Sequence, residues 1–284
     1  MKQTKNGLKT LCAAGLILSV LSMGSCNKEA QKLPSIQSSS SDESVLVGTP
    51  IAWWKFDSSW KQTVGNLPGL PHNGVKYTST ANAKYGKAAF LSLDSGFSTN
   101  NSVPAKLAGI DTALTVDFWI FATAPQPGGA QCLFALPQTG SFWPNMHVLL
   151  DGYNPGQGDS MLIKTMFKAN KPGVTYIEQW VDAGGIPNGY NHWTHIQFSY
   201  RGSTSKYTLK VNGHTYVDHR VLYNNDPMSG GTPLGSLAFI NTHGFVVGAF
   251  QNTWDPVLFG APQPWMLKYK GRIDQLKIYN TALF

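Results

Sequence analysis

The sequence predicts an all-β protein, folded as a two-sheet antiparallel sandwich or jelly roll. Apolar and polar residues alternate with period two in many short segments, for example at 115–120 and 194–200. Clusters of Gly, Pro and Asn separate these segments, as at 126–129 and 154–156. No stretch shows a sustained helical period. Short strands joined by turns therefore account for the folded part of the chain.

The expected strands follow from this alternation. Asn212 and Gly213 stand between the β-rich segments 206–211 and 214–217, and an Asn-Gly pair in this setting is a strong signal for a tight hairpin. Further strands are expected at 115–120, 146–151, 160–167, 175–181, 194–200, 236–240, 245–250 and 272–279.

The first 25 residues have the plan of a secretion signal. Three lysines precede an almost unbroken apolar stretch at 11–21, and small residues follow up to Ser25. The apolar stretch is shorter than the about 20 residues that a membrane-spanning helix needs. Residues 1–25 are therefore predicted to be a signal peptide that is removed.

The junction before Cys26 resembles the lipobox of bacterial lipoproteins, in which a cysteine after small residues is acylated and becomes the new N-terminus. The resemblance implies that Cys26 carries lipid and that the membrane is contacted through this anchor only. It also implies an outer membrane lipoprotein, on the periplasmic or the cell-surface side. The alternative is an ordinary signal peptide that is cut near a cysteine.

The mature chain divides into a tether and one domain. Residues 26–48 include a polar, Ser-rich run at 38–43, which buries too little apolar surface to fold and behaves as a flexible spacer. From Thr49 the composition changes, and 49–284 contains no second linker. We expect a single domain there, because β-sandwiches of 200–250 residues are common.

Charge and cysteine content exclude several classes of protein. Removal of the three signal lysines lowers the formal charge from +7 to +4, and no Lys/Arg cluster suggests a nucleic acid partner. After loss of the signal and lipidation of Cys26, only Cys132 remains, so no intramolecular disulfide can form. Cys132 lies in an apolar stretch and is expected to be a buried small hydrophobe.

The domain resembles laminin-G-like, concanavalin A-like jelly rolls in a series of short motifs. These stand in the family's order: AWWKFD at 52–57, HNG at 72–74, YGKAAF at 85–90, LTVDFWI at 114–120, HWTHI at 192–196, LKVNG at 209–213 and GRIDQLKIYNTAL at 271–283. The resemblance covers 51–284. It implies two curved antiparallel sheets stacked face to face, with the first and last strands paired. The segment 126–191 is longer than in the minimal family domain, and such extra loops are where function resides on a rigid scaffold.

Catalytic patterns are poor. Glycoside hydrolysis needs two carboxyl groups that face each other across the sugar. Glu178 is the only Glu between 49 and 284, and the Glu-x-Asp-x-x-Glu motif of glucanases with this fold is missing. The seven His residues form no metal-binding or nucleophile motif. We therefore expect no enzymatic activity.

Aromatic residues provide the positive signal, because sugars stack their apolar faces on exposed Trp and Tyr rings beside polar groups. Successive side chains of a strand point to opposite faces of the sheet. In the expected strands 146–151, 175–182 and 192–200, one set of aromatic and polar side chains therefore points outward. If these strands are neighbours in one sheet, the set forms a platform for a glycan. Its candidate ligand-binding members are His147, Asp151, Tyr176, Glu178, Trp180, His195 and Gln197, with Trp193 beside them as a scaffold residue.

Four loop aromatics are further candidates for ligand contact. Each is flanked by Pro or Gly residues that could fix an exposed ring, and none belongs to a scaffold motif. They are Trp143, Tyr153, Trp254 and Trp265.

Two acidic residues could bind a structural calcium ion. Asp57 is expected on the first strand and Asp274 on the last, so pairing of these strands would bring their carboxylates together, and carboxylates are calcium ligands. The alternative is that Asp274 accepts hydrogen bonds from backbone groups as a scaffold residue.

Together these features predict a cell-envelope lipoprotein that binds carbohydrate without cleaving it, beside neighbouring glycan-uptake proteins. Two alternatives stay open: a glycoside hydrolase of the same fold, and a protein-binding or adhesive module. Fold alone does not choose among them.

Overall fold

The structure is a computed structural model. It describes residue 46 and the ranges 48–59, 63–64, 69–72, 75–87, 89–93, 96–99, 109–123, 128–152, 160–225, 230–254 and 256–284. All of these belong to one compact unit, Ser41–Phe284. The predicted signal peptide, Cys26, most of the tether, Tyr153 and the Asn-Gly of the 72–74 motif lie outside the described residues.

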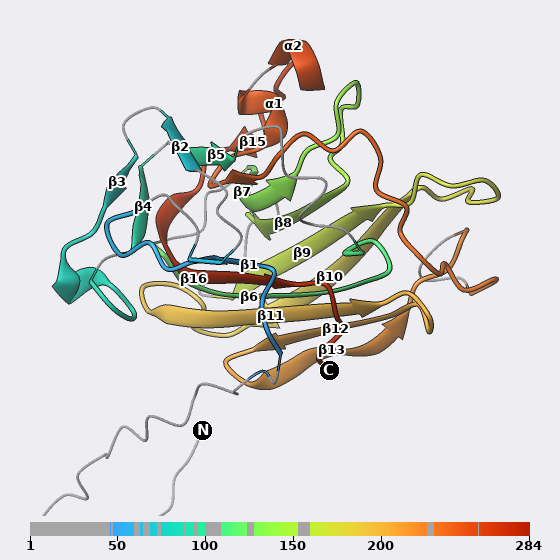
Figure 1. Cartoon of the computed structure of the whole chain (residues 1–284), viewed down its shortest axis with the longest axis horizontal. Helices are drawn as coiled ribbons and strands as arrows, with labels where there is room; N and C mark the ends of the chain where they lie inside the picture. Colours follow the sequence, from blue (N-terminus) through green and yellow to red (C-terminus); the bar gives the residue numbers. More distant parts are fainter. Residues whose placement is uncertain are drawn as a thin grey trace, which may run out of the picture. The chain divides into compact units, whose positions relative to one another are not determined.

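The described strands form two antiparallel sheets, which confirms the predicted jelly-roll sandwich (Figure 1). In sheet A the strand order is β13-β12-β11-β6-β16-β4-β3, and β1 pairs with β16. Its strands are β1 (Ala52–Trp54), β3 (Lys76–Tyr77), β4 (Phe90–Leu93), β6 (Ala113–Ala122), β11 (Trp193–Arg201), β12 (Lys206–Val211), β13 (His214–Val221) and β16 (Lys270–Tyr279).

In sheet B the order is β10-β9-β8-β7-β14-β5-β2, and β15 runs parallel to β7. Its strands are β2 (Gly69–His72), β5 (Gly96–Thr99), β7 (Ala130–Leu136), β8 (Met146–Asp151), β9 (Met161–Lys168), β10 (Glu178–Ile186), β14 (Val246–Val247) and β15 (Met266–Leu267). Three short helical segments complete the described elements: η1 (Thr80–Asn82), α1 (Gln251–Trp254) and α2 (Pro256–Phe259).

The predicted hairpin at Asn212 and Gly213 and the pairing of the first and last strands are confirmed. β12 and β13 pair across the Asn-Gly turn, where both residues have positive φ angles of 49° and 78°. β1 pairs with β16 in the register Ala52↔Ile278, and Figure 1 shows this blue strand beside the red one. The ends of the domain are therefore joined inside one sheet.

Some predicted strands differ from the structure. The strand expected at 175–181 begins three residues later, at Glu178, because the backbone amides of Thr175 and Tyr176 bond to the carbonyl of Asn224 instead of a β ladder. No strand forms at 236–240, where Asn145 binds the backbone of Ile240 through its side chain.

Around the segment expected as a strand at 245–250, only the two residues of β14 pair. β7, a strand that the alternation did not predict, is buried on both faces, and such strands read as continuous apolar runs.

The core between the sheets is aromatic. Phe134 of sheet B lies 5.8 Å from Phe118 and 6.1 Å from Phe198 of sheet A, measured between ring centroids. The Tyr207 and Thr165 hydroxyls, one from each sheet, are 2.7 Å apart. The predicted inward faces of β8 and β11 are confirmed. The side chains that face this core are Met146, Val148 and Leu150 on β8 and Ile196, Phe198 and Tyr200 on β11.

Among the described residues, no helix has the length and apolar character to cross a membrane.

Candidate functional site

The strand order divides the predicted platform between two faces. β8 and β10, which carry His147 and Trp180, belong to sheet B, whereas β11, which carries His195 and Gln197, belongs to sheet A. The assumption that these strands are neighbours in one sheet is therefore wrong. The predicted inward and outward directions were right along β8 and β11 and for residues 178–182 of β10, but not for Ile177. Such alternation cannot tell which sheet a strand joins.

On the outer face of sheet B, side chains line up across four strands. The register places Ala135 of β7 opposite His147 of β8, His147 opposite Met166 of β9, and Met166 opposite Trp180 of β10. Residues directly opposite one another on one face lie within contact distance. This row is the floor of the candidate site.

Two predicted loop tryptophans converge on this floor. The Trp143 ring lies 5.4 Å from Trp180 and 5.8 Å from Trp265, and Trp265 lies 5.5 Å from Phe250. All three tryptophans are half-buried, so part of each ring reaches solvent. We call this group the sheet B aromatic cluster. It consists of Phe142, Trp143, His147, Trp180, Phe250 and Trp265.

Helix α1 holds the loop that carries Trp143. The Gln251 side-chain amide donates to the carbonyls of Ser141 and Phe142, at 2.8 and 3.0 Å, and its oxygen accepts from the Gln138 amide. Asn252 donates to the Phe142 carbonyl at 3.2 Å. These buried amides fix residues 138–142 and so position the Trp143 ring.

His147 lies beneath the tryptophans and is fully buried. Its ring is 5.6 Å from Trp143 and 5.2 Å from Trp180. Neither ring nitrogen has a hydrogen-bond partner among the described residues. Burial lowers the pKa of His147 to about 3, so the ring is neutral at physiological pH. With no exposed surface, His147 supports the rings above it, which differs from its predicted role in ligand contact.

A charged row adjoins the aromatic cluster. The Lys164 ammonium lies 2.6 Å from Asp151 and 3.7 Å from Asp182, and the side chain of Asp182 is 58% exposed. Burial lowers the pKa of Lys164, but its hydrogen bond to Asp151 and the charges of Asp182 and Asp151 together raise it above its usual value. Asp182 follows Trp180 by two residues on β10, so polar groups line one side of the tryptophans.

The other side of the cluster carries a second opposite-charge pair. Glu178 lies opposite Lys168 in the β9–β10 register, and the Lys168 ammonium donates to the Ser141 hydroxyl. Burial lowers the pKa of Lys168, against the opposing influence of the Glu178 charge.

The remaining aromatic candidates lie elsewhere. Tyr176 is 38% exposed and precedes β10, and Ile177, expected to face the core, is 42% exposed. Trp254 is the half-buried last residue of α1.

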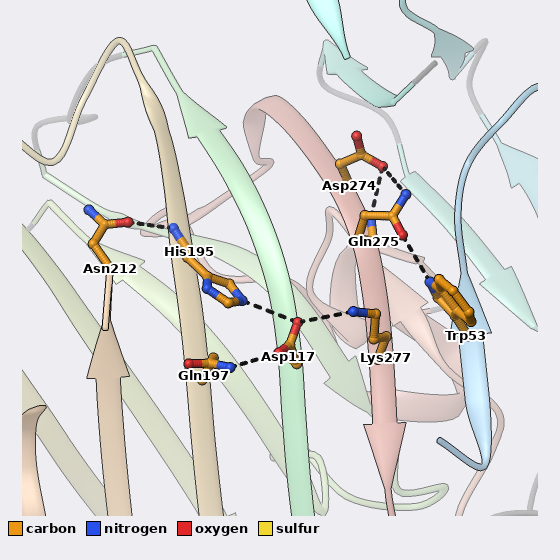
Figure 2. Close-up of polar contacts among 8 residues, drawn as sticks. All are labelled: Trp53, Asp117, His195, Gln197, Asn212, Asp274, Gln275 and Lys277. Carbon is orange, nitrogen blue, oxygen red and sulfur yellow. Dashed lines mark hydrogen bonds and ion pairs between the residues drawn. The ribbon is translucent and has the colours of Figure 1, made fainter. Parts of the chain in front are cut away.

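His195 and Gln197 belong to a buried network on the outer face of sheet A, which Figure 2 shows. His195 Nε2 lies 3.2 Å from one Asp117 oxygen, and Gln197 donates to the other at 2.8 Å. Lys277 lies 4.0 Å from the first oxygen, and the His195 amide donates to Asn212. His195 and Gln197 are 2% and 1% exposed, so they stabilise the sheet and are not placed to touch a ligand.

Asp57 and Asp274 both accept backbone amides of the turn at 84–87, and the Asp57 charge helps to raise the pKa of Asp274. The pKa of Asp274 rises to about 6, chiefly because the carboxyl is buried, while hydrogen bonds oppose the shift. Asp274 accepts the amides of Lys84, Tyr85 and Gln275. This geometry agrees with the scaffold interpretation of Asp274.

The two carboxylates together shape the turn at 84–87. Asp57 accepts the Lys87 amide, and Gly86 has φ +68° with Asp57 so close that any Cβ would overlap it. Only glycine fits there without strain. Among the described residues, no group of three or more His, Cys, Asp or Glu side chains is arranged to hold a metal ion. Calcium binding stays a prediction.

Three site residues escaped the sequence analysis. Phe142, Phe250 and Lys164 all contact the predicted residues. Phe142 lies in a loop, and Phe250 ends the segment expected as a strand at 245–250, of which only Val246 and Val247 pair. The outward parity of β9 could have identified Lys164.

Comparison with known proteins gives similarity of fold. No protein-family model and no curated protein matches the sequence. A structure of botulinum neurotoxin type C, described as dependent on two ganglioside molecules for cell entry, is 12% identical with a TM-score of 0.53, over 82% of this chain and 48% of the toxin chain. The binding domain of botulinum neurotoxin DC, in complex with rat synaptotagmin II, is 12% identical with a TM-score of 0.52, over 83% and 49%.

A third structure is the Ruminococcus gnavus IT-sialidase CBM40 bound to α2,3-sialyllactose. It is 12% identical with a TM-score of 0.45, over 66% of this chain and 88% of that one. This chain spans about half the length of the two toxin chains that it matches. At these identities the likeness concerns the jelly-roll fold alone.

Proposed function

We propose that this protein binds carbohydrate, without cleaving it, on the outer face of sheet B. The observation that carries the proposal is the convergence of Trp143, Trp180 and Trp265, three half-buried rings from three separate parts of the chain. The apolar face of a pyranose stacks on such rings. The fold also fits, because a toxin of similar fold is described as interacting with gangliosides.

The charges beside the rings favour a neutral sugar. Lys164 forms ion pairs with Asp151 and Asp182, and Lys168 lies opposite Glu178 in the strand register, so both described lysines beside the cluster have an acidic residue close by. The exposed Asp182 and the neighbouring polar groups can accept hydrogen bonds from sugar hydroxyls. A neutral glycan, with its hydroxyl rim and apolar face, suits this mixture of groups.

The same charges support binding over hydrolysis. Hydrolysis requires two carboxyl groups on either side of the scissile bond. Carboxylates do lie on both sides of the rings, but each has a lysine beside it: Asp151 and Asp182 contact the Lys164 ammonium, and Glu178 lies opposite Lys168 in the strand register. A neighbouring lysine favours the ionised carboxylate over the protonated acid that hydrolysis also needs. A solved structure of similar fold is the binding domain of botulinum neurotoxin DC, which also supports this view.

The proposal is tested by substituting Trp180 with alanine and measuring retention on a panel of neutral polysaccharides by affinity electrophoresis. We expect Trp180→Ala to weaken binding about tenfold or more, because a central aromatic anchor carries a large share of such an interface. Tyr176→Ala, an exposed aromatic outside the cluster, is the matched control and should bind as the wild type does. If the unaltered protein is retained by no neutral glycan, the proposal fails.

We further propose that Cys26 is lipidated and that residues 26–48 tether the domain outside the cytoplasm, at the outer membrane. The support is the lipobox-like junction after a signal-like segment. Expressed in a bacterium with lipoprotein processing, the full chain should partition with membranes, and Cys26→Ala should appear in the soluble fraction. Intact-mass measurement should detect acyl chains only on the cysteine form. A Cys26→Ala chain that stays with the membrane contradicts this proposal.

A further inference from the structure

The outer face of sheet A ends in a row of one arginine and two aromatic residues. The register places Arg272 of β16 opposite Phe121 of β6, and Phe121 opposite Trp193 of β11. Their neighbours Ile273, Ile120 and Thr194 are buried, which directs this row outward. All three side chains of the row are half-buried, in contrast to the fully buried network around Asp117 on the same face.

The Arg272 guanidinium lies over the Phe121 ring and close to Trp193, whose ring packs edge-on against Phe121 at 74°. The guanidinium carbon is 3.8 Å from the Phe121 ring centroid and 5.8 Å from that of Trp193. Nη1 donates to the carbonyl and side-chain oxygens of Asn82, both at 3.2 Å. Within the described part of the chain, Arg272 forms no ion pair, so the positive charge of its guanidinium is not neutralised by a carboxylate.

A second cation lies beside this row. The Lys84 ammonium is 4.0 Å from the ring centroid of Trp119, the next outward residue of β6, and 5.3 Å from that of Tyr85. Tyr85 is 36% exposed and packs edge-on against Trp119. The nearby Asp274 carboxylate is directed at backbone amides, and Lys84 has no ion-pair partner among the described residues.

We name these five residues the sheet A cationic strip: Lys84, Tyr85, Phe121, Trp193 and Arg272. The strip differs from the sheet B cluster in one decisive respect. On sheet B, Lys164 forms ion pairs with Asp151 and Asp182, and the Glu178 charge acts on Lys168 from the opposite position of β10. Neither cation of the strip forms an ion pair among the described residues; both lie against aromatic rings. An arginine that is held over an aromatic ring and lacks a carboxylate partner is suited to bidentate binding of a carboxylate or sulfate.

We infer that the sheet A cationic strip is a second binding site, for an acidic polysaccharide that carries carboxylate or sulfate groups. The anionic group of one sugar would pair with Arg272 and Lys84, while an adjacent sugar ring would stack on the partly exposed faces of Trp193 and Tyr85. The site lies on the opposite sheet from the proposed neutral-glycan site and does not depend on it.

A sugar suits the strip better than an anionic membrane surface. Membrane recognition through charge uses clusters of about four to eight Lys or Arg residues. The strip has two cations, each lying against aromatic rings. Such a pairing of ring and charge matches a single acidic sugar unit.

The test uses affinity electrophoresis of the full chain in gels that contain polygalacturonate, dextran sulfate or neutral dextran. The variants are Arg272→Gln, Lys84→Gln and the double substitution. Arg201→Gln is the matched control, since Arg201 is exposed at the other end of β11 on the same sheet. It removes the same charge outside the strip.

We expect both acidic polymers to retard the wild type, and the double variant to lose about tenfold or more in affinity. Arg201→Gln should change affinity less than twofold, and Trp180→Ala should leave the acidic retardation intact. Arg272→Lys should recover only part of the binding, because an ammonium cannot form the two-pronged contact. Should Arg272→Gln fail to fold by its melting curve, Lys84→Gln alone carries the test, with a partial loss expected.

Three outcomes would overturn the inference. One is a wild type that neither acidic polymer retards. Another is an equal loss in Arg201→Gln, which would indicate attraction by net charge alone. The third is binding to vesicles of phosphatidylcholine with phosphatidylglycerol, dependent on Lys84 and Arg272, without binding to the polymers. Failure of the sheet B proposal would be seen separately, with neutral polysaccharides and Trp180→Ala.

Discussion

His147 illustrates how burial controls the chemistry of a single residue in this protein. It lies on the outer face of sheet B, yet Trp143, Trp180 and Phe250 cover it. A charged imidazolium in such surroundings loses its hydration, so the pKa falls to about 3. The unfolded chain, with an ordinary histidine pKa near 6.5, binds a proton that the folded state does not.

The difference between the folded and unfolded pKa values of His147 predicts that acid destabilises the folded protein. Because the folded pKa is lowered, the free energy of unfolding should fall as pH drops below about 6.5, by about 2 kcal/mol at pH 5. His147→Phe keeps an aromatic ring and removes the titrating group, so this loss should disappear. Urea unfolding at pH 5 and pH 7.5 measures the effect.

The matched control is His214→Phe, at an exposed position of β13, which should keep the acid loss of the wild type. Asp274 has a raised pKa in the folded state, so its contribution to the free energy of unfolding grows as pH falls from about 6 to about 4, opposite to that of His147. Asp274 is present in the wild type and in both variants, so its contribution cancels in the comparison. The comparison therefore isolates His147. An equal acid loss in His147→Phe and the wild type would contradict the assignment.

At the scale of the elements, short helical and loop segments define the candidate site more than the strands do. α1 has only four residues, but Gln251 and Asn252 are both buried and bind the backbone of the loop before Trp143. Asn252 also donates to the Phe259 carbonyl at 2.7 Å and so joins α1 to α2. Figure 1 shows α1 and α2 projecting beyond β7 and β15.

Loss of this anchor should weaken both stability and glycan binding. Asn252→Ala removes the donor to the buried Phe259 carbonyl and one of the two donors to the Phe142 carbonyl, which costs about 1–3 kcal/mol. The Trp143 loop would lose its fixed position, so affinity for a bound glycan should fall in parallel. Urea unfolding followed by tryptophan fluorescence, together with affinity electrophoresis, measures both effects.

Thr253→Ala provides the control for the same helix. Its hydroxyl donates to the Phe250 carbonyl within the segment and, among the bonds described, not to the Trp143 loop. Glycan affinity should stay at the wild-type value. If Asn252→Ala also binds as the wild type does, the loop anchor is not what positions the site.

The main core of the domain is shared between the two sheets. Phe198 of sheet A packs against Phe134 and Phe167 of sheet B, with centroid distances of 6.1 and 6.4 Å. A smaller apolar cluster, which includes Cys132, Leu149 and Phe250, lies on the outer side of sheet B. Because the large apolar side chains of both sheets meet in the shared core, the two sheets should unfold together. The two candidate faces lie on the outside of this common support.

Phe198→Ala tests this cooperativity. Removing a buried phenylalanine costs about 3–5 kcal/mol, and the loss should appear in one transition. Far-UV circular dichroism and tryptophan fluorescence should give the same midpoint, whereas Tyr216→Ala, which is exposed on β13, should barely move it. Two separated transitions would show that the sheets are independent units.

The sequence determined the features that depend on neighbours along the chain. Period-two alternation placed β6, β8, β9, β11 and β16 within a few residues and assigned the inward faces of β8 and β11, because side-chain direction along a strand is fixed locally. Asn212 and Gly213 fixed a hairpin because few residues adopt positive φ angles. The chemistry of aromatic rings also singled out Trp143, Trp180 and Trp265.

The tertiary structure alone decided which of these residues meet. His147 and His195 have the same outward parity, yet one lies in sheet B and the other in sheet A, because strand partners are set by packing between distant segments. Trp143 and Trp265 are 122 positions apart and meet only when β15 pairs with β7. Burial then separated the half-exposed tryptophans from the covered His147, His195 and Gln197, since the amount of water that reaches a side chain depends on every segment folded over it.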